Sequence, residues 1–263
     1  MSVCRNCGKE LPVDATFCPN CGTRATSTVN QPLSTSPTPL KYKVVGEYVP
    51  VVELELGSGQ IIYAESGALV YKDPTISMDA EVTKGLTGGL TRVLTGESFF
   101  TLNFSGPGRL GLGHEFPGEI KIIEIQPGQE LHVQAGAFLF AQTSVNYEWY
   151  RVRGVKTIFF GGEGLLMGKF TGRGLLGLYG DGNIITKQLG PGEKLNAEAG
   201  LLVCKEASVG MDVSFIGLKT GIFGGEGLFL LNLTGPGTVA LQTMNEHTLF
   251  RKIWNSCPHR SHR

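Results

Sequence analysis

Four cysteines near the start of the chain stand in two pairs with the spacing of a metal site. Two residues separate the cysteines of each pair, ten residues separate the pairs, and a glycine follows each pair. This spacing lets both thiolates of a pair bind one metal ion, and the glycine permits the positive φ with which such a turn ends. Four sulfur ligands fill a tetrahedral site and leave no open position for a substrate. The sequence therefore predicts one structural zinc ion (Zn2+), whose ligands are Cys4, Cys7, Cys18 and Cys21.

The segment that carries these cysteines is too poor in apolar side chains to fold on packing alone. Residues 1–22 offer few sizeable ones, such as Leu11 and Phe17. Zinc binding supplies folding free energy directly to short modules of this kind. We expect residues 1–22 to form a zinc ribbon, with a transient redox pair of thiols as the alternative. Because four thiolates and one zinc ion carry a net negative charge, docking to a protein or a structural role is favoured over nucleic-acid binding.

A linker is predicted next. Residues 23–40 are rich in serine, threonine and proline and carry a single charge, Arg24. Such a composition cannot bury enough apolar area to offset the entropy lost on ordering. The ribbon is therefore expected to be tethered flexibly to the rest of the chain.

The body of the protein, residues 41–245, is predicted to be all-β. Residues 51–56 and 120–125 are short runs of β-branched and aliphatic residues with a period close to two, which indicates strands with one buried face. Glycine and Pro-Gly steps between such runs supply the tight turns that antiparallel strands require. No stretch of about twelve residues or more shows a convincing helical period.

One short phrase returns three times in this body and defines a repeat. The three copies are Ala64–Val70, Val133–Leu139 and Ala197–Val203. Each follows a turn signal that contains glycine, and each leads to a Gly-Glu step about thirty residues later. The repeats are expected at about residues 51–115, 120–180 and 184–243.

Three β domains of this size would each be marginally stable alone, so the repeats are expected to share a core. With three similar units, the favoured arrangement is a pseudo-threefold closure around one axis, the single-chain counterpart of a cyclic trimer. An open stack of three repeats is the less favoured alternative.

The repeats also place an acidic residue at an equivalent position in each copy. These residues are Glu97, Glu163 and Glu226. A threefold arrangement would bring the three carboxylates into related sites, where they could bind a cation or a basic partner. The simpler interpretation is that each accepts hydrogen bonds from its own glycine-rich turn. These stretches lack the lysine and the helix start of a phosphate-binding loop.

Other residues with reactive side chains form no catalytic pattern. Cys204 takes the place that Tyr71 and Phe140 have in the other repeats, so an apolar buried environment is expected for it. No histidine recurs in register with a serine, cysteine or acid, as a catalytic triad would require. Residues 246–263 are interpreted as a basic tail. A disordered tail is favoured over the alternative, in which Cys257 and its neighbouring histidines bind a metal ion.

Composition and charge narrow the classes of function. The formal net charge is zero, which argues against broad electrostatic binding to nucleic acid or to an anionic membrane. The chain has no signal-peptide pattern and no uncharged apolar run near twenty residues. Four of the six cysteines belong to the two pairs, which is no disulfide framework. We expect a cytoplasmic protein without a transmembrane segment.

The motif at residues 84–100, followed by Phe104-Ser105-Gly106-Pro107-Gly108, resembles the signature of the altered inheritance of mitochondria protein 24 family. The resemblance covers roughly residues 40 to 245 and includes the repeats. It implies a fold like that of the tryptophan RNA-binding attenuator protein, a β-sandwich or short double-stranded β-helix, here in three copies. Such folds oligomerise readily. No RNA or tryptophan ligand residue can be matched, so neither activity is carried over. Mitochondrial members are linked to inner-membrane organisation.

The leading functional hypothesis is a non-enzymatic scaffold or protein-interaction module with a structural zinc ribbon. A nucleic-acid-binding or regulatory protein is the first alternative, and a small-ligand-binding protein or an enzyme is the second. A protein partner is expected. Homo-oligomerisation and peripheral association with a membrane are left open.

Overall fold

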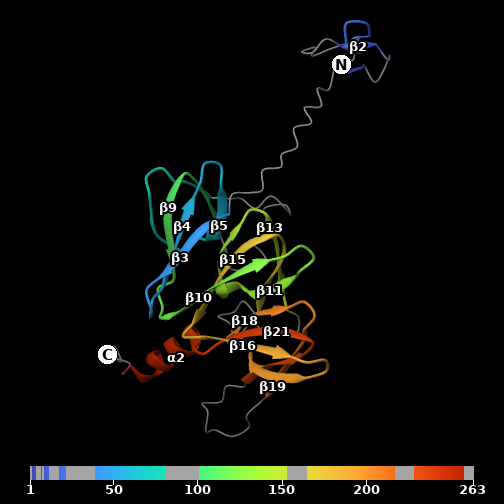
Figure 1. Ribbon diagram of the computed structural model, residues 1–263. Coiled ribbons are helices and arrows are strands. Elements are labelled where there is room, and N and C mark those ends of the chain that lie inside the picture. The colour runs from blue at the N-terminus through green and yellow to red at the C-terminus, as the bar shows by residue number, and fades with distance from the viewer. Residues whose placement is uncertain are drawn as a thin grey trace, which may run out of the picture. The chain divides into compact units, whose positions relative to one another are not determined.

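The computed structural model describes two compact units, Met1–Pro39 and Leu40–Arg263 (Figure 1). The residues described are 2–3, 7, 9–11, 18–21, 39–80, 101–152, 165–216 and 228–257. Most of the predicted linker lies outside them. Leu40, which the sequence assigned to the linker, is buried in the body.

Among its described residues, the first unit contains one small antiparallel strand pair. Strand β1 (Ser2–Val3) pairs with β2 (Glu10–Leu11), so that Ser2 lies opposite Leu11. The first predicted ligand pair lies between these two strands in sequence.

Among its described residues, the second unit consists of strands, two short 3-10 helices and one α-helix, in agreement with the all-β fold that the sequence predicted. Each repeat contributes six described strands. Strand β3 (Lys41–Val45) precedes the repeats. Repeat 1 consists of β4 (Val51–Leu56), β5 (Ile61–Glu65), β6 (Leu69–Lys72), β7 (Ser77–Ala80), β8 (Thr101–Ser105) and β9 (Gly108–Gly113).

Repeats 2 and 3 follow the same order, with a short 3-10 helix before the third strand. Repeat 2 consists of β10 (Gly118–Ile125), β11 (Leu131–Gln134), η1 (Ala135–Ala137), β12 (Phe138–Gln142), β13 (Val145–Arg151), β14 (Leu166–Gly172) and β15 (Gly174–Asp181). Repeat 3 consists of β16 (Ile184–Leu189), β17 (Lys194–Glu198), η3 (Ala199–Leu201), β18 (Leu202–Glu206), β19 (Gly210–Ile216), β20 (Leu228–Thr234) and β21 (Gly237–Gln242).

The strands pair in the same way within every repeat. The sixth strand lies between the first and the third, and the fifth lies between the second and the fourth. Each repeat therefore holds two antiparallel groups of three strands. The turns between the first and second strands place Gly59, Gly128 and Gly192 at positive φ, as the repeated turn signals predicted.

Neighbouring repeats are joined by strand pairing. Strand β12 of repeat 2 pairs with β5 of repeat 1, and β18 of repeat 3 pairs with β11 of repeat 2. Each joint merges two three-stranded groups into one six-stranded sheet. We call these pairings the first and the second joint.

Strand pairing among the described residues does not close the three repeats around one axis. In Figure 1 the repeats follow one another in an open row, with repeat 2 between the other two. Among the described strands, β6 pairs with none but β9, and β17 with none but β20. A closed arrangement would pair β6 with β17.

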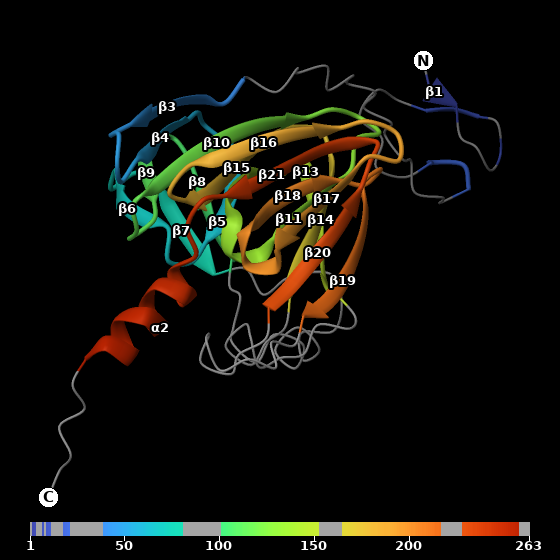
Figure 2. The same ribbon diagram turned by 90° about the horizontal axis from the view of Figure 1, so that it is seen from below.

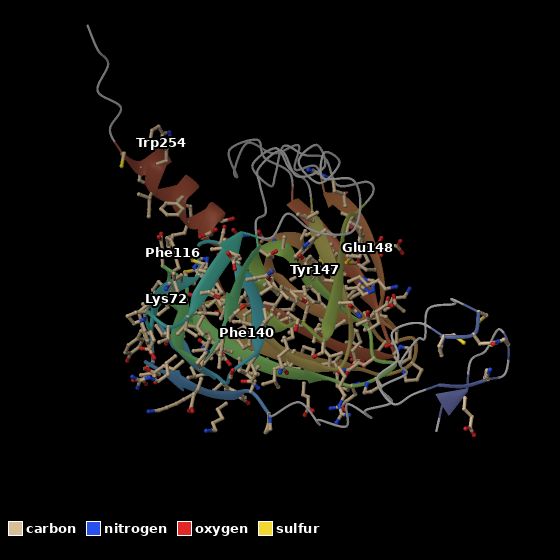
Figure 3. All side chains as sticks on the ribbon, turned by 90° about the horizontal axis from the view of Figure 1, so that it is seen from above. Lys72, Phe116, Phe140, Tyr147, Glu148 and Trp254 are labelled. Atoms are coloured by element: carbon tan, nitrogen blue, oxygen red, sulfur yellow. The ribbon has the colours of Figure 1, made fainter. Side chains whose placement is uncertain are left out.

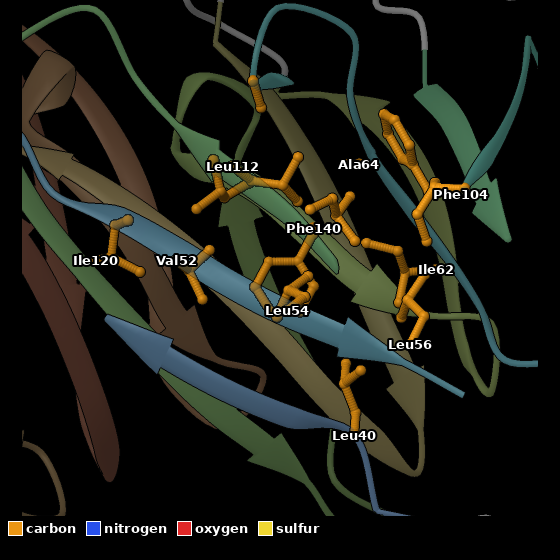
Figure 4. Packing of buried hydrophobic residues seen from close by; sticks show 14 of the residues in the cluster. Leu40, Val52, Leu54, Leu56, Ile62, Ala64, Phe104, Leu112, Ile120 and Phe140 are labelled. Carbon is orange, nitrogen blue, oxygen red and sulfur yellow. The ribbon is translucent and has the colours of Figure 1, made fainter. Parts of the chain in front are cut away.

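The joints also connect the hydrophobic cores. Cluster 1 surrounds Leu54, Ile62 and Phe104, cluster 2 surrounds Ile125, Leu131 and Phe170, and cluster 3 surrounds Leu189, Leu231 and Leu233. Leu139 and Phe140 of repeat 2 belong to cluster 1, where Figure 4 shows Phe140 among the side chains of repeat 1. Val203 and Cys204 of repeat 3 belong to cluster 2 in the same way. Each of the first two cores is therefore completed by the repeat that follows it.

Residues Glu246–Ser256 form helix α2, so the interpretation of this part of the tail as disordered is wrong. The rest of the predicted tail, residues 258–263, lies outside the described residues. The Asn245 side chain caps the helix by accepting a hydrogen bond from the Thr248 amide at 3.3 Å. The Asp181 carboxylate accepts a bond from the amide of Glu246 at 3.1 Å, which ties the helix start to β15. In Figure 1 and Figure 2 the helix projects from the strands. Within the described residues, no helix combines the length and apolarity needed to cross a membrane.

Candidate metal centre and a polar cluster at the second joint

Three of the four predicted zinc ligands come together in the first unit. The ligand atoms of Cys7, Cys18 and Cys21 all lie within 4.8 Å of one another. The sulfurs of Cys7 and Cys18 are 3.6 Å apart, far beyond a disulfide bond and close to the roughly 3.8 Å that separates two sulfurs on one tetrahedral zinc ion. The fourth predicted ligand, Cys4, lies outside the described residues. The donor set and its spacing therefore fit zinc.

Local structure prepares these sulfurs to bind a cation. A hydrogen bond from the backbone of Lys9 lowers the pKa of the Cys7 thiol. Because a metal binds the thiolate, a lowered pKa favours binding near neutral pH. Cys18 is buried, whereas the neighbouring Pro19 and Asn20 are exposed. The metal would thus support a surface turn and leave its outer face available to a partner.

A second group of ionisable side chains lies at the second joint, on four adjacent strands. His132 on β11 lies opposite Lys169 on β14 and opposite Lys205 on β18. Its Nε2 is 2.8 Å from a carboxylate oxygen of Glu130, and its Nδ1 bonds the hydroxyl of Tyr150 on β13. The other Glu130 oxygen accepts a bond from Lys169 at 2.7 Å. These side chains form a continuous network, which we call the His132 cluster.

The surroundings determine how this cluster is charged. Burial lowers the pKa of His132, against the opposing effect of its bond to Glu130. The bond from Lys169 is the largest cause of a lowered pKa for the Glu130 carboxyl. Burial raises the pKa of Tyr150 to about 12, so its hydroxyl keeps its proton at neutral pH. A neutral His132 can then donate from Nε2 to Glu130 and accept at Nδ1 from Tyr150.

The geometry of the His132 cluster suits a structural role. Both ring nitrogens of His132 are engaged, so neither is available to a metal ion or a substrate without breaking a bond. Lys205, which is buried, donates to the backbone oxygen of Val209 at 2.8 Å, and burial lowers the pKa of its ammonium group. The cluster therefore satisfies polar groups where repeats 2 and 3 meet.

Sequence reasoning missed this cluster for a physical reason. At the first joint the position equivalent to His132 is Tyr63, which packs against Phe138 and Tyr147 and donates a hydrogen bond to the Val145 carbonyl. The two joints thus fill the same place with different chemistry, and no repeated motif marks it. The one local signal is the spacing of Glu130 and His132, which puts both side chains on one face of a strand.

The remaining predicted sites divide into those described and those not. Cys204 is buried in cluster 2, and burial raises the pKa of its thiol to about 12, in line with the apolar environment expected for it. His114 stacks on Tyr179, with ring centroids 4.5 Å apart. The symmetric glutamates Glu97, Glu163 and Glu226 lie outside the described residues.

Comparison with known proteins assigns the body, residues 41–245, to a protein family. A family model described as mitochondrial biogenesis AIM24 matches residues 42–244. The chain belongs to the AIM24 family. The resemblance inferred from the motif at residues 84–100 is therefore confirmed. A zinc-ribbon domain model matches residues 3–24, which confirms the second domain type.

Two proteins similar to this AIM24 chain come from Streptococcus pyogenes. An uncharacterised protein of serotype M6 is 28% identical over 213 residues, which are 74% of this chain and 82% of that protein. A crystal structure of an S. pyogenes protein superposes with a TM-score of 0.66 at 22% identity and covers 83% of this chain and 100% of that one. This likeness supports the all-β fold.

Proposed function

We propose that this AIM24 chain is a non-enzymatic scaffold, in which the three-repeat body carries a zinc-stabilised ribbon that docks a protein partner. The observation that carries the proposal is the convergence of Cys7, Cys18 and Cys21 within 4.8 Å. An all-sulfur site is closed to substrates and serves folding. The function of the ribbon then lies in the protein surface that the zinc site holds in place.

The charge and exposure of that surface favour a protein as the partner. The described residues beside the ligands, Lys9, Glu10, Pro19 and Asn20, are all exposed, and their charges cancel. A surface without excess positive charge is poorly suited to phosphate groups. Outside the ribbon, the described cysteines Cys204 and Cys257 form no disulfide bond. Unpaired thiols of this kind support a reducing compartment such as the cytoplasm.

The test is to remove the ribbon's metal while the body stays folded. The double variant Cys7→Ser with Cys21→Ser should lose its zinc, measured by elemental analysis of the purified full chain, and should lose the proteins recovered with it by affinity purification. The unfolding transition of the body should stay unchanged. Cys257→Ser is the matched control, because that exposed cysteine lies in the other unit. Unchanged zinc content, or an unchanged set of recovered proteins, would refute the docking role.

A further inference from the structure

The two joints between repeats use equivalent strands in the same register. At the first joint Phe140 lies opposite Ala64, and at the second joint Cys204 lies opposite Val133. Phe140 and Cys204 hold the same place in the repeated phrase, as do Ala64 and Val133. The next pair follows in step, with Ala141 opposite Tyr63 and Lys205 opposite His132. The register of pairing is therefore a property of the repeat itself.

Strand β6 is the counterpart of β12 and β18, but no described repeat precedes it. Its Val70 is 56% exposed, whereas the equivalent residues Leu139 and Val203 are 2% and 0% exposed. Its Tyr71 is 42% exposed, in contrast to the buried Phe140. In Figure 3, Lys72 of this strand lies at the margin of the body and Phe140 inside it. Strand β6 thus presents to solvent the same apolar surface that the other repeats bury at a joint.

Strand β17 is the counterpart of β5 and β11 at the other end of the row. Its Leu195 is only half-buried, although the equivalent Ile62 and Leu131 are buried. Clusters 1 and 2 each receive side chains from the third strand of the next repeat, and among the described residues cluster 3 receives none. The two ends of one chain are therefore the two halves of a joint.

We propose that β6 of one copy of this chain pairs with β17 of a second copy and forms a third joint between molecules. The internal register places Tyr71 opposite Ala197, Lys72 opposite Asn196 and Asp73 opposite Leu195. None of these pairs sets like charges against each other. Val70 of one copy enters cluster 3 of the next, as Leu139 enters cluster 1.

The joint is head-to-tail, so it propagates in one direction. Each copy that adds leaves one β6 edge and one β17 edge available, until the rotation per copy closes a ring or the array extends as a filament. The intermolecular joint has one backbone hydrogen bond fewer than the second joint, because Pro74 stands where the Ala207 amide donates to the Glu130 carbonyl at 3.1 Å. Because the joint forms between separate molecules, association depends on protein concentration. None of the residues proposed for the joint belongs to the unit that carries the ribbon.

The first test is the mass of the full-length, zinc-loaded protein in solution. Light scattering from about 1 μM to about 100 μM should show the mass rising in whole multiples of the single chain. Val70→Glu should weaken association at least about tenfold, because it would place a carboxylate without a partner in cluster 3. Ile185→Glu on β16 is the control, since Ile185 is also an exposed apolar residue, at 45%, but belongs to neither β6 nor β17. A single-chain mass throughout, or an equal effect of both substitutions, would overturn the proposal.

The second test reads the register directly. Lys72→Cys and Asn196→Cys are made in separate chains that also carry Cys257→Ser, and the two are mixed under mild oxidation. Directly opposite residues come within reach of a disulfide, so the mixture should yield a covalent dimer that neither variant forms alone. Lys43→Cys on β3, at an exposed position, replaces Lys72→Cys as the control. No dimer in the mixture, an equal yield with the control, or a dimer from Lys72→Cys alone would overturn the head-to-tail arrangement.

Discussion

Val70 and Val203 hold the same position in the repeated phrase, and the joints predict losses of stability of different size for the same substitution. Val203 is fully buried in cluster 2, and one of its methyl groups lies 3.4 Å from the position that a Cβ on Gly180 would take. Val70 is 56% exposed. Any difference between Val203→Ala and Val70→Ala therefore measures what a following repeat adds to the core of the preceding one.

The expected magnitudes follow from the buried volume. Val→Ala removes two carbon atoms, worth about 0.8 kcal/mol each when fully buried, and a cavity adds to this loss. Val203→Ala should therefore lower the free energy of unfolding by about 2–3 kcal/mol. Val70→Ala should lower it by under about 1 kcal/mol, because more than half of that side chain already contacts water.

Urea unfolding of the full chain checks both values. Trp149 is a suitable fluorescent probe, since its ring packs edge-on against Phe170 of cluster 2. The measurement is made at a dilution at which the protein has the mass of one chain, so that association does not cover Val70. Equal losses at Val70 and Val203 would refute the reasoning, because the joints would then not determine which residues are buried.

Three further predictions concern the polar cluster, the helix and a glycine. The free energy of unfolding should fall as the pH drops below about 6.5, since the pKa of His132 is lower in the folded than in the unfolded state. Denaturation measured at several pH values should show that His132→Gln reduces this pH dependence. Asn245→Ala should cost α2 about 1 kcal/mol through loss of its cap, seen as faster amide exchange in its first turn; unchanged exchange would contradict the capping role. Gly177→Ala should destabilise the body by about 1–3 kcal/mol in thermal unfolding, because the new Cβ would lie 2.2 Å from the ring of Phe140. Gly190→Ala is the control and should be nearly neutral, because its nearest contact is 3.5 Å away, on the flexible side chain of Glu193.

The strands and turns could be predicted from the sequence because their signals are local. Alternation at residues 51–56 matches a strand whose even-numbered residues are buried, and the turn glycines adopt a positive φ in the tight turns that the sequence predicted. Repetition then extended each local inference to three places. The family could be inferred as well, because its motif is long and continuous in sequence.

Three features could not be predicted from the sequence: the open row of the repeats, the His132 cluster and helix α2. Each depends on contacts between residues that are remote in sequence. An open row and a closed ring contain the same strands and differ only in the rotation across each joint. Tyr150 reaches His132 from two strands away in the sheet. Helix α2 is fixed partly by Asp181, which lies 65 residues before Glu246. No spacing in the sequence marks Tyr150 as a partner of His132, or Asp181 as a partner of α2.

The placement of Leu139 and Phe140 in cluster 1 bears on the order in which the chain can fold as it is synthesised. Repeat 1 is complete as a set of strands once β9 has been made, yet its core still lacks these two side chains. The core of repeat 1 therefore stays incomplete at least until β12 has left the ribosome. In the same way, the core of repeat 2 stays incomplete until Val203 and Cys204 of repeat 3 have been synthesised. A ribosome that stalls between two repeats would therefore present an open sheet edge and an unfilled core to the surrounding cell, which is the state in which β proteins aggregate.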